Sequence, residues 1–205
     1  MATTSCLARF ASNPGPHHWY SALRILRYLK GTSHYTLNYY RKPRKEGQSF
    51  QITGTSDANW GNDIKGRRSL HGFIVSLHGC PILWTSKKQT FVALSSTESE
   101  YIGLSESLRE IKWLTSILNE FNIPLQTPIL YGDNTASIQI ANNKSMENRI
   151  KGIDIKYHFI KDEIAKRNVT LCPVSSTENA ADIFTKPLDA KRFAILTNKI
   201  LKNNE

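Results

Sequence analysis

The spacing of apolar residues divides the chain into short alternating segments and longer amphipathic ones. Alternation of apolar and polar residues is typical of half-buried strands, whereas apolar residues three or four positions apart indicate helices. The alternating pattern predicts strands at 35–40, 50–57, 70–77, 81–85, 90–94, 128–133 and 169–174. The helical pattern predicts helices at 16–31, 135–141, 154–166, 179–185 and 190–202. The strongest predicted helix keeps an apolar face from Leu104 to Phe121 and ends before Pro124.

The order of these elements predicts an α/β fold. Strands come first as a meander and then alternate with helices, which favours a mixed sheet with helices on its faces. A polar stretch with proline and glycine at 41–48 predicts a boundary. We therefore expect a helical and strand appendage at 1–45, a main domain at 46–190, and a basic helix and tail at 191–205.

Charge adds a partner class to this picture. The 205 residues carry a formal net charge of +10, and seven of those charges fall before residue 51. Such an excess is typical of proteins that bind nucleic acid, although a basic surface that only serves solubility is the alternative. Three widely spaced cysteines predict neither a disulfide framework nor a zinc site. No apolar run predicts a membrane span, and the Met1 end lacks a signal-peptide pattern.

Five acidic residues fall at predicted junctions between elements. Asp57 and Asp133 end strands, Glu98 and Glu100 open the long helix, and Asp182 opens a later helix. Functional residues of open α/β sheets gather where strands end. Carboxylates are the ligands of hard cations such as Mg²⁺, and two such ions can clamp both oxygens of a phosphoryl transfer.

Each acid also has a local structural explanation. Asp57 and Asp133 fit turns or N-caps, and Asp182 would complement a helix dipole. Glu98 and Glu100 fit capping boxes in two registers, so we expect one of them to cap the helix. No phosphate-binding loop, glycine-rich dinucleotide motif or nucleophile–histidine set competes with the acids.

Five motifs in order along the chain are more specific than any single acid. They are Ser56-Asp-Ala-Asn-Trp-Gly, Ile82-Leu-Trp-Thr-Ser-Lys-Lys-Gln, Val92-Ala-Leu-Ser-Ser-Thr-Glu-Ser-Glu-Tyr, Gly132-Asp-Asn-Thr-Ala and Ala181-Asp-Ile-Phe-Thr-Lys-Pro-Leu. With them the chain resembles the ribonuclease H region of copia-type LTR retrotransposon Pol polyproteins. Residues 5–40 resemble the segment just upstream, so 1–45 would be the end of the reverse transcriptase.

The resemblance implies a ribonuclease H-like mixed five-stranded sheet with an Asp-Glu-Asp-Asp active site. Carried over by motif, the four acids are Asp57, Glu100, Asp133 and Asp182, with Glu98 as the alternative to Glu100. The implied reaction is endonucleolytic hydrolysis of the RNA strand of an RNA–DNA hybrid with two Mg²⁺ or Mn²⁺ ions. The loop 175–178 has no histidine, so product-release chemistry assigned to one in other ribonucleases H is not transferred.

The implied partners are an RNA–DNA hybrid and the reverse transcriptase portion of the same polyprotein, and no membrane. The candidate hybrid-binding residues are Lys87, Lys88, Arg67 and Arg68, although a lysine pair in a solvated turn is an equal alternative for the first two. A polymerase Tyr-x-Asp-Asp motif is absent, so no polymerase activity is expected. The expected location is a cytoplasmic virus-like particle, with the nucleus as a second possibility.

Two other functions compete with this interpretation. One is a catalytically silent, transposon-derived remnant that binds nucleic acid or protein without cutting. The other is a transposase or integrase on the same fold, which would use Asp-Asp-Glu with the glutamate on a late helix. The early glutamate and the late Asp182 favour the ribonuclease H interpretation over the second.

Overall fold

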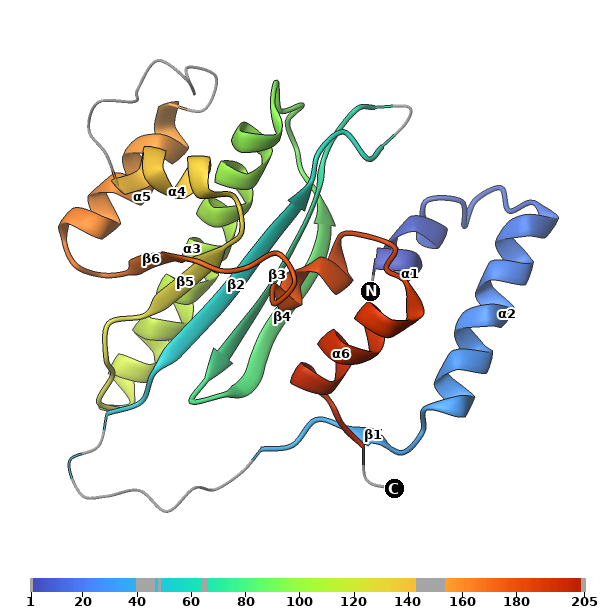
Figure 1. Ribbon diagram of the computed structural model, residues 1–205, viewed down its shortest axis with the longest axis horizontal. Coiled ribbons are helices and arrows are strands. Elements are labelled where there is room, and N and C mark those ends of the chain that lie inside the picture. Colours follow the sequence, from blue (N-terminus) through green and yellow to red (C-terminus); the bar gives the residue numbers. More distant parts are fainter. Residues whose placement is uncertain (1, 40–46, 48, 64–65, 143–153, 204–205) are drawn as a thin grey trace.

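A mixed five-stranded sheet forms the centre of the molecule, and helices pack against it (Figure 1). The computed structural model describes residues 2–39, 47, 49–63, 66–142 and 154–203. The strands are β1 (Tyr35–Thr36), β2 (Ile52–Asn59), β3 (Leu70–Leu77), β4 (Cys80–Lys88), β5 (Ile129–Gly132), β6 (Thr170–Pro173) and β7 (Lys202–Asn203). The helices are α1 (Ala2–Ala8), α2 (Pro16–Gly31), α3 (Ser96–Glu120), α4 (Thr135–Asn142), α5 (Asp154–Ala165), the 3₁₀ helix η3 (Ala180–Phe184) and α6 (Ala190–Ile200).

The strand order β4-β3-β2-β5-β6 combines an antiparallel meander with a parallel extension. Strands β2, β3 and β4 pair antiparallel, and the tight turn after β3 has His78 and Gly79 at positive φ. Strand β5 then pairs in parallel with β2, and β6 with β5. Parallel neighbours need a crossover connection, and the chain supplies these through α3 and through α4 with α5. The mixed α/β sheet predicted from the sequence is thereby confirmed.

Helix α3 covers one face of the sheet and supplies much of the core. The core side chains that are at most 1% exposed come from the helices and the strands alike: Ile52, Val75, Tyr101, Leu104, Leu108, Ile111, Leu130, Ile140 and Ile160. The helix approaches β2 closely at Gly103, where an added methyl carbon would lie 3.2 Å from the hydroxyl oxygen of Ser56. This close packing fixes the first turns of α3 against the end of β2 that carries Asp57.

The other face of the sheet carries η3, with α6 packed on it. Gly72 in β3 permits this contact, because a methyl carbon added there would lie 2.5 Å from Cβ of Phe184. The buried hydroxyl of Ser86 donates a hydrogen bond to the carbonyl of Phe184 at 2.6 Å. Together these contacts hold the segment that contains Asp182 against the sheet.

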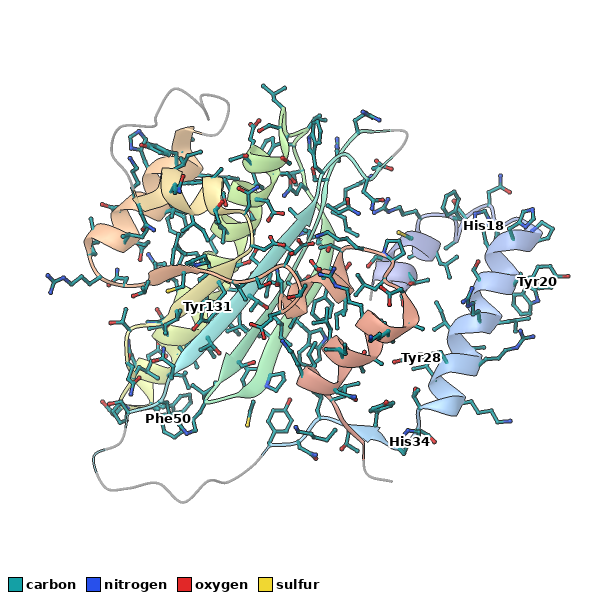
Figure 2. The ribbon with its side chains drawn as sticks, in the orientation of Figure 1. His18, Tyr20, Tyr28, His34, Phe50 and Tyr131 are labelled. Carbon is teal, nitrogen blue, oxygen red and sulfur yellow. The ribbon has the colours of Figure 1, made fainter. Side chains whose placement is uncertain are left out.

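Helix α2 and strand β1 lie beside α6 and β7 (Figure 1). In α1, the Ser5 hydroxyl donates to the carbonyl of Ser86 at 3.2 Å, which ties the segment to β4. The rings of Tyr28 and Phe193 meet edge to face with centroids 5.9 Å apart, and Figure 2 shows Tyr28 on the side of α2 toward α6 and Tyr20 on the side facing away. Strand β1 pairs with β7. The division at residues 45 and 46 stays a proposal, because 40–46 lie outside the described residues.

The structure corrects several predicted elements. The predicted strand at 90–94 is wrong: this segment is a loop in which Phe91 and Leu94 are 57% and 80% exposed. It has no partner strand within the described residues, and it only connects the end of β4 to the start of α3. Of the predicted strand at 35–40, only Tyr35 and Thr36 form a strand among residues 35–39, and Tyr40 lies outside the described residues. Strand β2 continues two residues beyond Asp57. None of the described helices is both long and apolar enough to span a bilayer.

Candidate active site

The neighbouring parallel strands β2 and β5 place Asp57 and Asp133 side by side. The pairing of β2 with β5 ends where Ser56 lies opposite Gly132, so Asp57 and Asp133 each follow the last paired residue. On its other side Asp57 still pairs with Gly72, which holds its backbone in the sheet. Successive side chains of a strand face opposite sides, so Ser56 faces α3 while Asp57 faces η3. The prediction that Asp57 ends its strand is therefore corrected to a position inside β2.

The third acid reaches the site on η3. Asn179 begins this helix by accepting a hydrogen bond from the amide of Ala181 at 3.1 Å. Its own side-chain amide donates to the carbonyl of Ser56 at 3.0 Å, and the residue is fully buried. Asp182, which is 1% exposed, follows three residues later. One buried asparagine thus joins η3 to the strand that carries Asp57.

The structure brings together all four acids that the motifs selected. One carboxylate oxygen from each of Asp57, Asp133 and Asp182 lies within 4.8 Å of the others. Glu100, from the start of α3, accepts a hydrogen bond from the backbone of Ala58 and interacts electrostatically with Asp57 and Asp133. Carboxylates from β2, from the start of α3, from the residue after β5 and from η3 therefore converge where β5 ends.

The two glutamates at the start of α3 have different surroundings. The Ser95 side chain accepts a hydrogen bond from the amide of Glu98 at 3.1 Å, and the Glu98 carboxylate accepts one from the amide of Leu94 at 2.7 Å. Glu98 is therefore occupied in capping the helix. Glu100 takes no part in this cap and lies among the aspartates. The geometry separates the two residues that the sequence left as alternatives.

Burial and nearby negative charge raise the pKa values of Glu100, Asp133 and Asp182. Burial raises the pKa of the Glu100 carboxyl to about 9, and the negative charges of Asp57 and Asp133 add to the rise. Burial and the charge of Asp57 raise the pKa of Asp182 to about 6 and also raise the pKa of Asp133. Crowded, desolvated carboxylates favour their protonated form unless positive charge is supplied. Positive charge placed among these carboxylates would therefore be stabilised.

Two cationic side chains that sequence reasoning did not assign to the site meet this cluster. The ammonium nitrogen of Lys186 lies 2.8 Å from Oδ1 of Asp57 and 3.0 Å from Oδ1 of Asp182. Arg192, from α6, donates to the other oxygen of Asp182 and to the carbonyl of Ser176. The sequence offered one sign of the Lys186 contacts, which is its spacing of four residues from Asp182. That spacing indicates an ion pair within one helix and does not reveal the contact with Asp57.

The four predicted nucleic-acid-binding residues lie near one another on the β3–β4 side of the sheet. Lys87 and Lys88 are the last residues of β4, and not a turn after it. Lys88 forms an ion pair with Asp63 at 3.0 Å. Arg67 and Arg68 are exposed in the loop before β3. Lys87, Arg67 and Arg68 are thus available to solvent, whereas Lys88 has an intramolecular partner.

One solved structure with a similar fold is a ribonuclease H. No family model matches the chain. LC11-RNase H1, solved in complex with an RNA/DNA hybrid, superposes with a TM-score of 0.51 at 13% identity, over 65% of this chain and 93% of that one. The open sheet with its order β4-β3-β2-β5-β6 is therefore a ribonuclease H-like fold.

Sequence relatives identify the family. The Pol polyprotein of the tobacco (Nicotiana tabacum) transposon TNT 1-94 is 34% identical over 92% of this chain, and that of the Arabidopsis thaliana transposon RE1 is 35% identical over 95%. The chain belongs to the family of retrovirus-related Pol polyproteins of copia-type transposons. It spans only 14% and 13% of the length of these two relatives. It is also 45% identical, over 56% of its length, to 77% of the secreted RxLR effector protein 161 of Plasmopara viticola.

Proposed function

We propose that the chain hydrolyses the RNA strand of RNA–DNA hybrids in a reaction that depends on divalent metal ions. The observation that carries the proposal is the convergence of Asp57, Asp133 and Asp182 within 4.8 Å, with Glu100 beside them. The family and the fold support it, since LC11-RNase H1 shares the fold and binds an RNA/DNA hybrid. Other chemistries are not supported by a comparable cluster of reactive groups in the described residues.

The acids fit a hard divalent cation. Mg²⁺ and Mn²⁺ prefer oxygen ligands, and this cluster offers the three aspartates together with Glu100. The raised pKa values of Glu100 and Asp182 come first from burial and then from the negative charge of neighbouring aspartates, and a bound divalent cation would favour the ionised form of both. We propose that Asp57, Glu100, Asp133 and Asp182 hold two such ions. When bound, these ions would polarise the attacking water and the scissile phosphate.

The protein's own part in the reaction is to hold the acids rigidly. Asp57 is fully buried, and the hydroxyl of Thr185 donates to its Oδ2, so its carboxylate has a fixed orientation. Asn179 keeps η3 against β2 and also hydrogen-bonds to Asp133. Preorganised ligands avoid the cost of reorganising charged groups during the reaction.

The exposed cationic side chains near the edge strand β4 suit binding that does not depend on base sequence. We propose that Lys87, Arg67 and Arg68 contact phosphates of the hybrid, with Lys88 contributing once its pair with Asp63 opens. Contacts of this kind read the shape and the backbone of a duplex instead of its bases. They also make binding strongly dependent on salt.

A second candidate function is a silent remnant that binds nucleic acid or protein without cutting. The positive charges of Lys186 and Arg192 favour it, because they neutralise Asp57 and Asp182 without any metal. One relative is named as a secreted effector protein and not as a Pol polyprotein, which also supports this second candidate. We prefer the nuclease because Glu100 and Asp133 form no ion pair among the described residues, which leaves two acids for cations from solution.

The wider setting of the reaction is also a proposal. The chain corresponds to a small part of its polyprotein relatives, whose remaining segments would include the reverse transcriptase. We propose that cleavage follows DNA synthesis by that portion, in a virus-like particle in the cytoplasm or after entry into the nucleus. No polymerase activity is proposed for this chain.

The test is a strand-resolved cleavage assay. The purified chain is incubated with an RNA–DNA hybrid labelled on either strand, in Mg²⁺ or Mn²⁺ and then with chelator, beside Asp57→Asn and Asp133→Asn. We expect fragments of the RNA strand only, which chelator and both substitutions abolish. Lys199→Gln, an exposed change on α6, is the matched control and should cleave normally. Cleavage that survives both aspartate substitutions would contradict the proposal.

A further inference from the structure

The ammonium group of Lys186 lies where cations from solution would have to bind. It is 2.8 Å from Oδ1 of Asp57 and 3.0 Å from Oδ1 of Asp182. Both carboxylates belong to the group of three whose oxygens lie within 4.8 Å of one another. A metal ion that shared these oxygens would approach the ammonium closely, and like charges at such distances repel strongly near a protein interior.

The burial of Asp57 and Asp182 explains why a positively charged side chain is needed beside them. Asp57 is 0% exposed and Asp182 is 1% exposed, so both are cut off from solvent. A buried carboxylate without a positive partner is strongly destabilising. Lys186 supplies that partner to both residues, and Arg192 supplies a second one to Asp182.

Lys186 can also leave. Its side chain is 34% exposed, whereas the acids that it joins are buried. A lysine side chain is long and flexible, and it is held here by two contacts at its tip. Arg192 differs, because its guanidinium also donates to the backbone carbonyl of Ser176 and it forms no contact with Asp57 among the described residues. Asp57, by contrast, forms no ion pair other than that with Lys186 among the described residues.

From this geometry we infer that Lys186 is a built-in counterion that occupies the centre in the metal-free protein and that metal ions must displace. The inference rests on the proposed metal-dependent function and adds a competing residue to it. It has two consequences. The lysine lowers the affinity of the centre for divalent cations, and it stabilises the fold when they are absent.

The test measures metal binding and stability without any substrate. Mg²⁺ is titrated into the full chain by calorimetry at constant ionic strength, and the thermal midpoint is recorded with chelator and with saturating Mg²⁺. We expect Lys186→Gln to bind Mg²⁺ about ten-fold more tightly than the wild type, because a charge a few ångströms from the ion is removed. We also expect its midpoint to fall in chelator and to recover in Mg²⁺.

Two further variants keep the outcome interpretable. Lys186→Arg retains the charge and can hold carboxylates with two donors, so it should bind Mg²⁺ no more tightly than the wild type. Lys199→Gln makes the same change of net charge on α6, with its partner Glu178 3.9 Å away, and should behave like the wild type. If Lys186→Gln does not fold in chelator, its refolding on addition of Mg²⁺ still reports the predicted rescue.

The possible results separate this inference from the proposed function. Mg²⁺ binding that Asp57→Asn abolishes and Lys186→Gln leaves unchanged or weakens would overturn the inference alone, because the lysine would then be a structural partner only. Absence of Mg²⁺ and Mn²⁺ binding in the wild type and in every variant would overturn the proposed function and the inference together.

Discussion

At the scale of single residues, environment decides which glutamate belongs to the acidic centre. Glu98 and Glu100 are two positions apart on α3, and both fit a capping pattern. The helix can use only one of them. The Glu98 carboxylate accepts from the amide of Leu94, and the Glu98 amide donates to the Ser95 hydroxyl, so Glu98 is the one that caps the helix. Glu100 lies in a buried position, and burial raises the pKa of its carboxyl to about 9. A local sequence pattern could not separate them, since the difference comes from Asp57 and Asp133, which are distant in sequence.

The raised pKa of Glu100 predicts how stability changes with pH in the absence of metal. Its ordinary pKa is 4.5 and its folded pKa is about 9, so between these values the folded state holds a proton that the unfolded state has lost. Stability conferred by that proton is lost as the pH rises through this window. We expect the thermal midpoint in chelator to fall from pH 5 to pH 9.

The matching variants are Glu100→Gln and Glu120→Gln. The first removes the titrating group and should flatten the fall, whereas the second changes an exposed acid at the end of the same helix and should leave it as in the wild type. A midpoint that rises between pH 5 and pH 9, or a slope that Glu100→Gln does not reduce, would contradict the assignment of Glu100 to a crowded acidic site.

At the scale of elements, patterning predicts what is local and misses what depends on partners. The helices at 16–31 and 154–166 and the β3–β4 hairpin follow from periodicity and turn residues. The alternation at 90–94 finds no strand to pair with in the part of the chain that the structure describes, and it forms a loop instead. Strand β7 was missed because two residues carry no periodicity, and it exists only through β1. The roles of Lys186 and Arg192 were also missed, because their contacts with the acids come from tertiary packing.

The contact of η3 with β3 makes a prediction at this scale. A methyl group at Gly72 would overlap Cβ of Phe184 and approach the carbonyl of Ala181 at 3.3 Å. Because backbone cannot move aside easily, we expect Gly72→Ala to lower the free energy of unfolding by about 1–3 kcal/mol. Displacing η3 would also move Asp182, so Mg²⁺ binding should weaken in the folded fraction.

Urea unfolding and Mg²⁺ titration of this variant test the prediction. Gly31→Ala is the control, because an added methyl group there meets nothing within 4 Å and should change stability little. Unchanged stability and Mg²⁺ affinity in Gly72→Ala would show that η3 is not held by this close approach.

At the scale of the whole molecule, the net charge of +10 conceals an acidic centre. Seven of the ten charges fall before residue 51, outside the segments that carry the four acids. The sheet brings the acids together, while Lys87, Arg67 and Arg68 remain exposed. A basic protein can therefore attract a polyanion and still offer carboxylates to divalent cations.

This charge distribution predicts salt-dependent binding to a hybrid. In chelator, the affinity should fall steeply as salt rises, because phosphate contacts release counterions. Removing the exposed cations together, by Arg67→Gln, Arg68→Gln and Lys87→Gln, should weaken binding and reduce the slope of log affinity against log salt by up to about 3. Fluorescence anisotropy with a labelled hybrid measures both quantities.

The control for this set is Lys166→Gln, which removes a lysine that pairs with Asp162 at the end of α5. It should leave the affinity and the slope close to the wild-type values. Binding by the wild type that does not respond to salt would contradict a surface that reads the backbone.

The most direct test of the metal-dependent nuclease centre compares the two neighbouring glutamates in one cleavage assay. The rate of RNA-strand cleavage in a hybrid is measured in Mg²⁺ for the wild type, Glu98→Gln and Glu100→Gln at a temperature where all three are folded. Losing a ligand of the catalytic metal removes several kcal/mol of transition-state stabilisation, and each 1.36 kcal/mol is a factor of ten in rate. We therefore predict a loss of at least about 100-fold for Glu100→Gln and near wild-type cleavage for Glu98→Gln. Equal rates in the two variants, or no Mg²⁺-dependent cleavage by the wild type, would contradict the assignment.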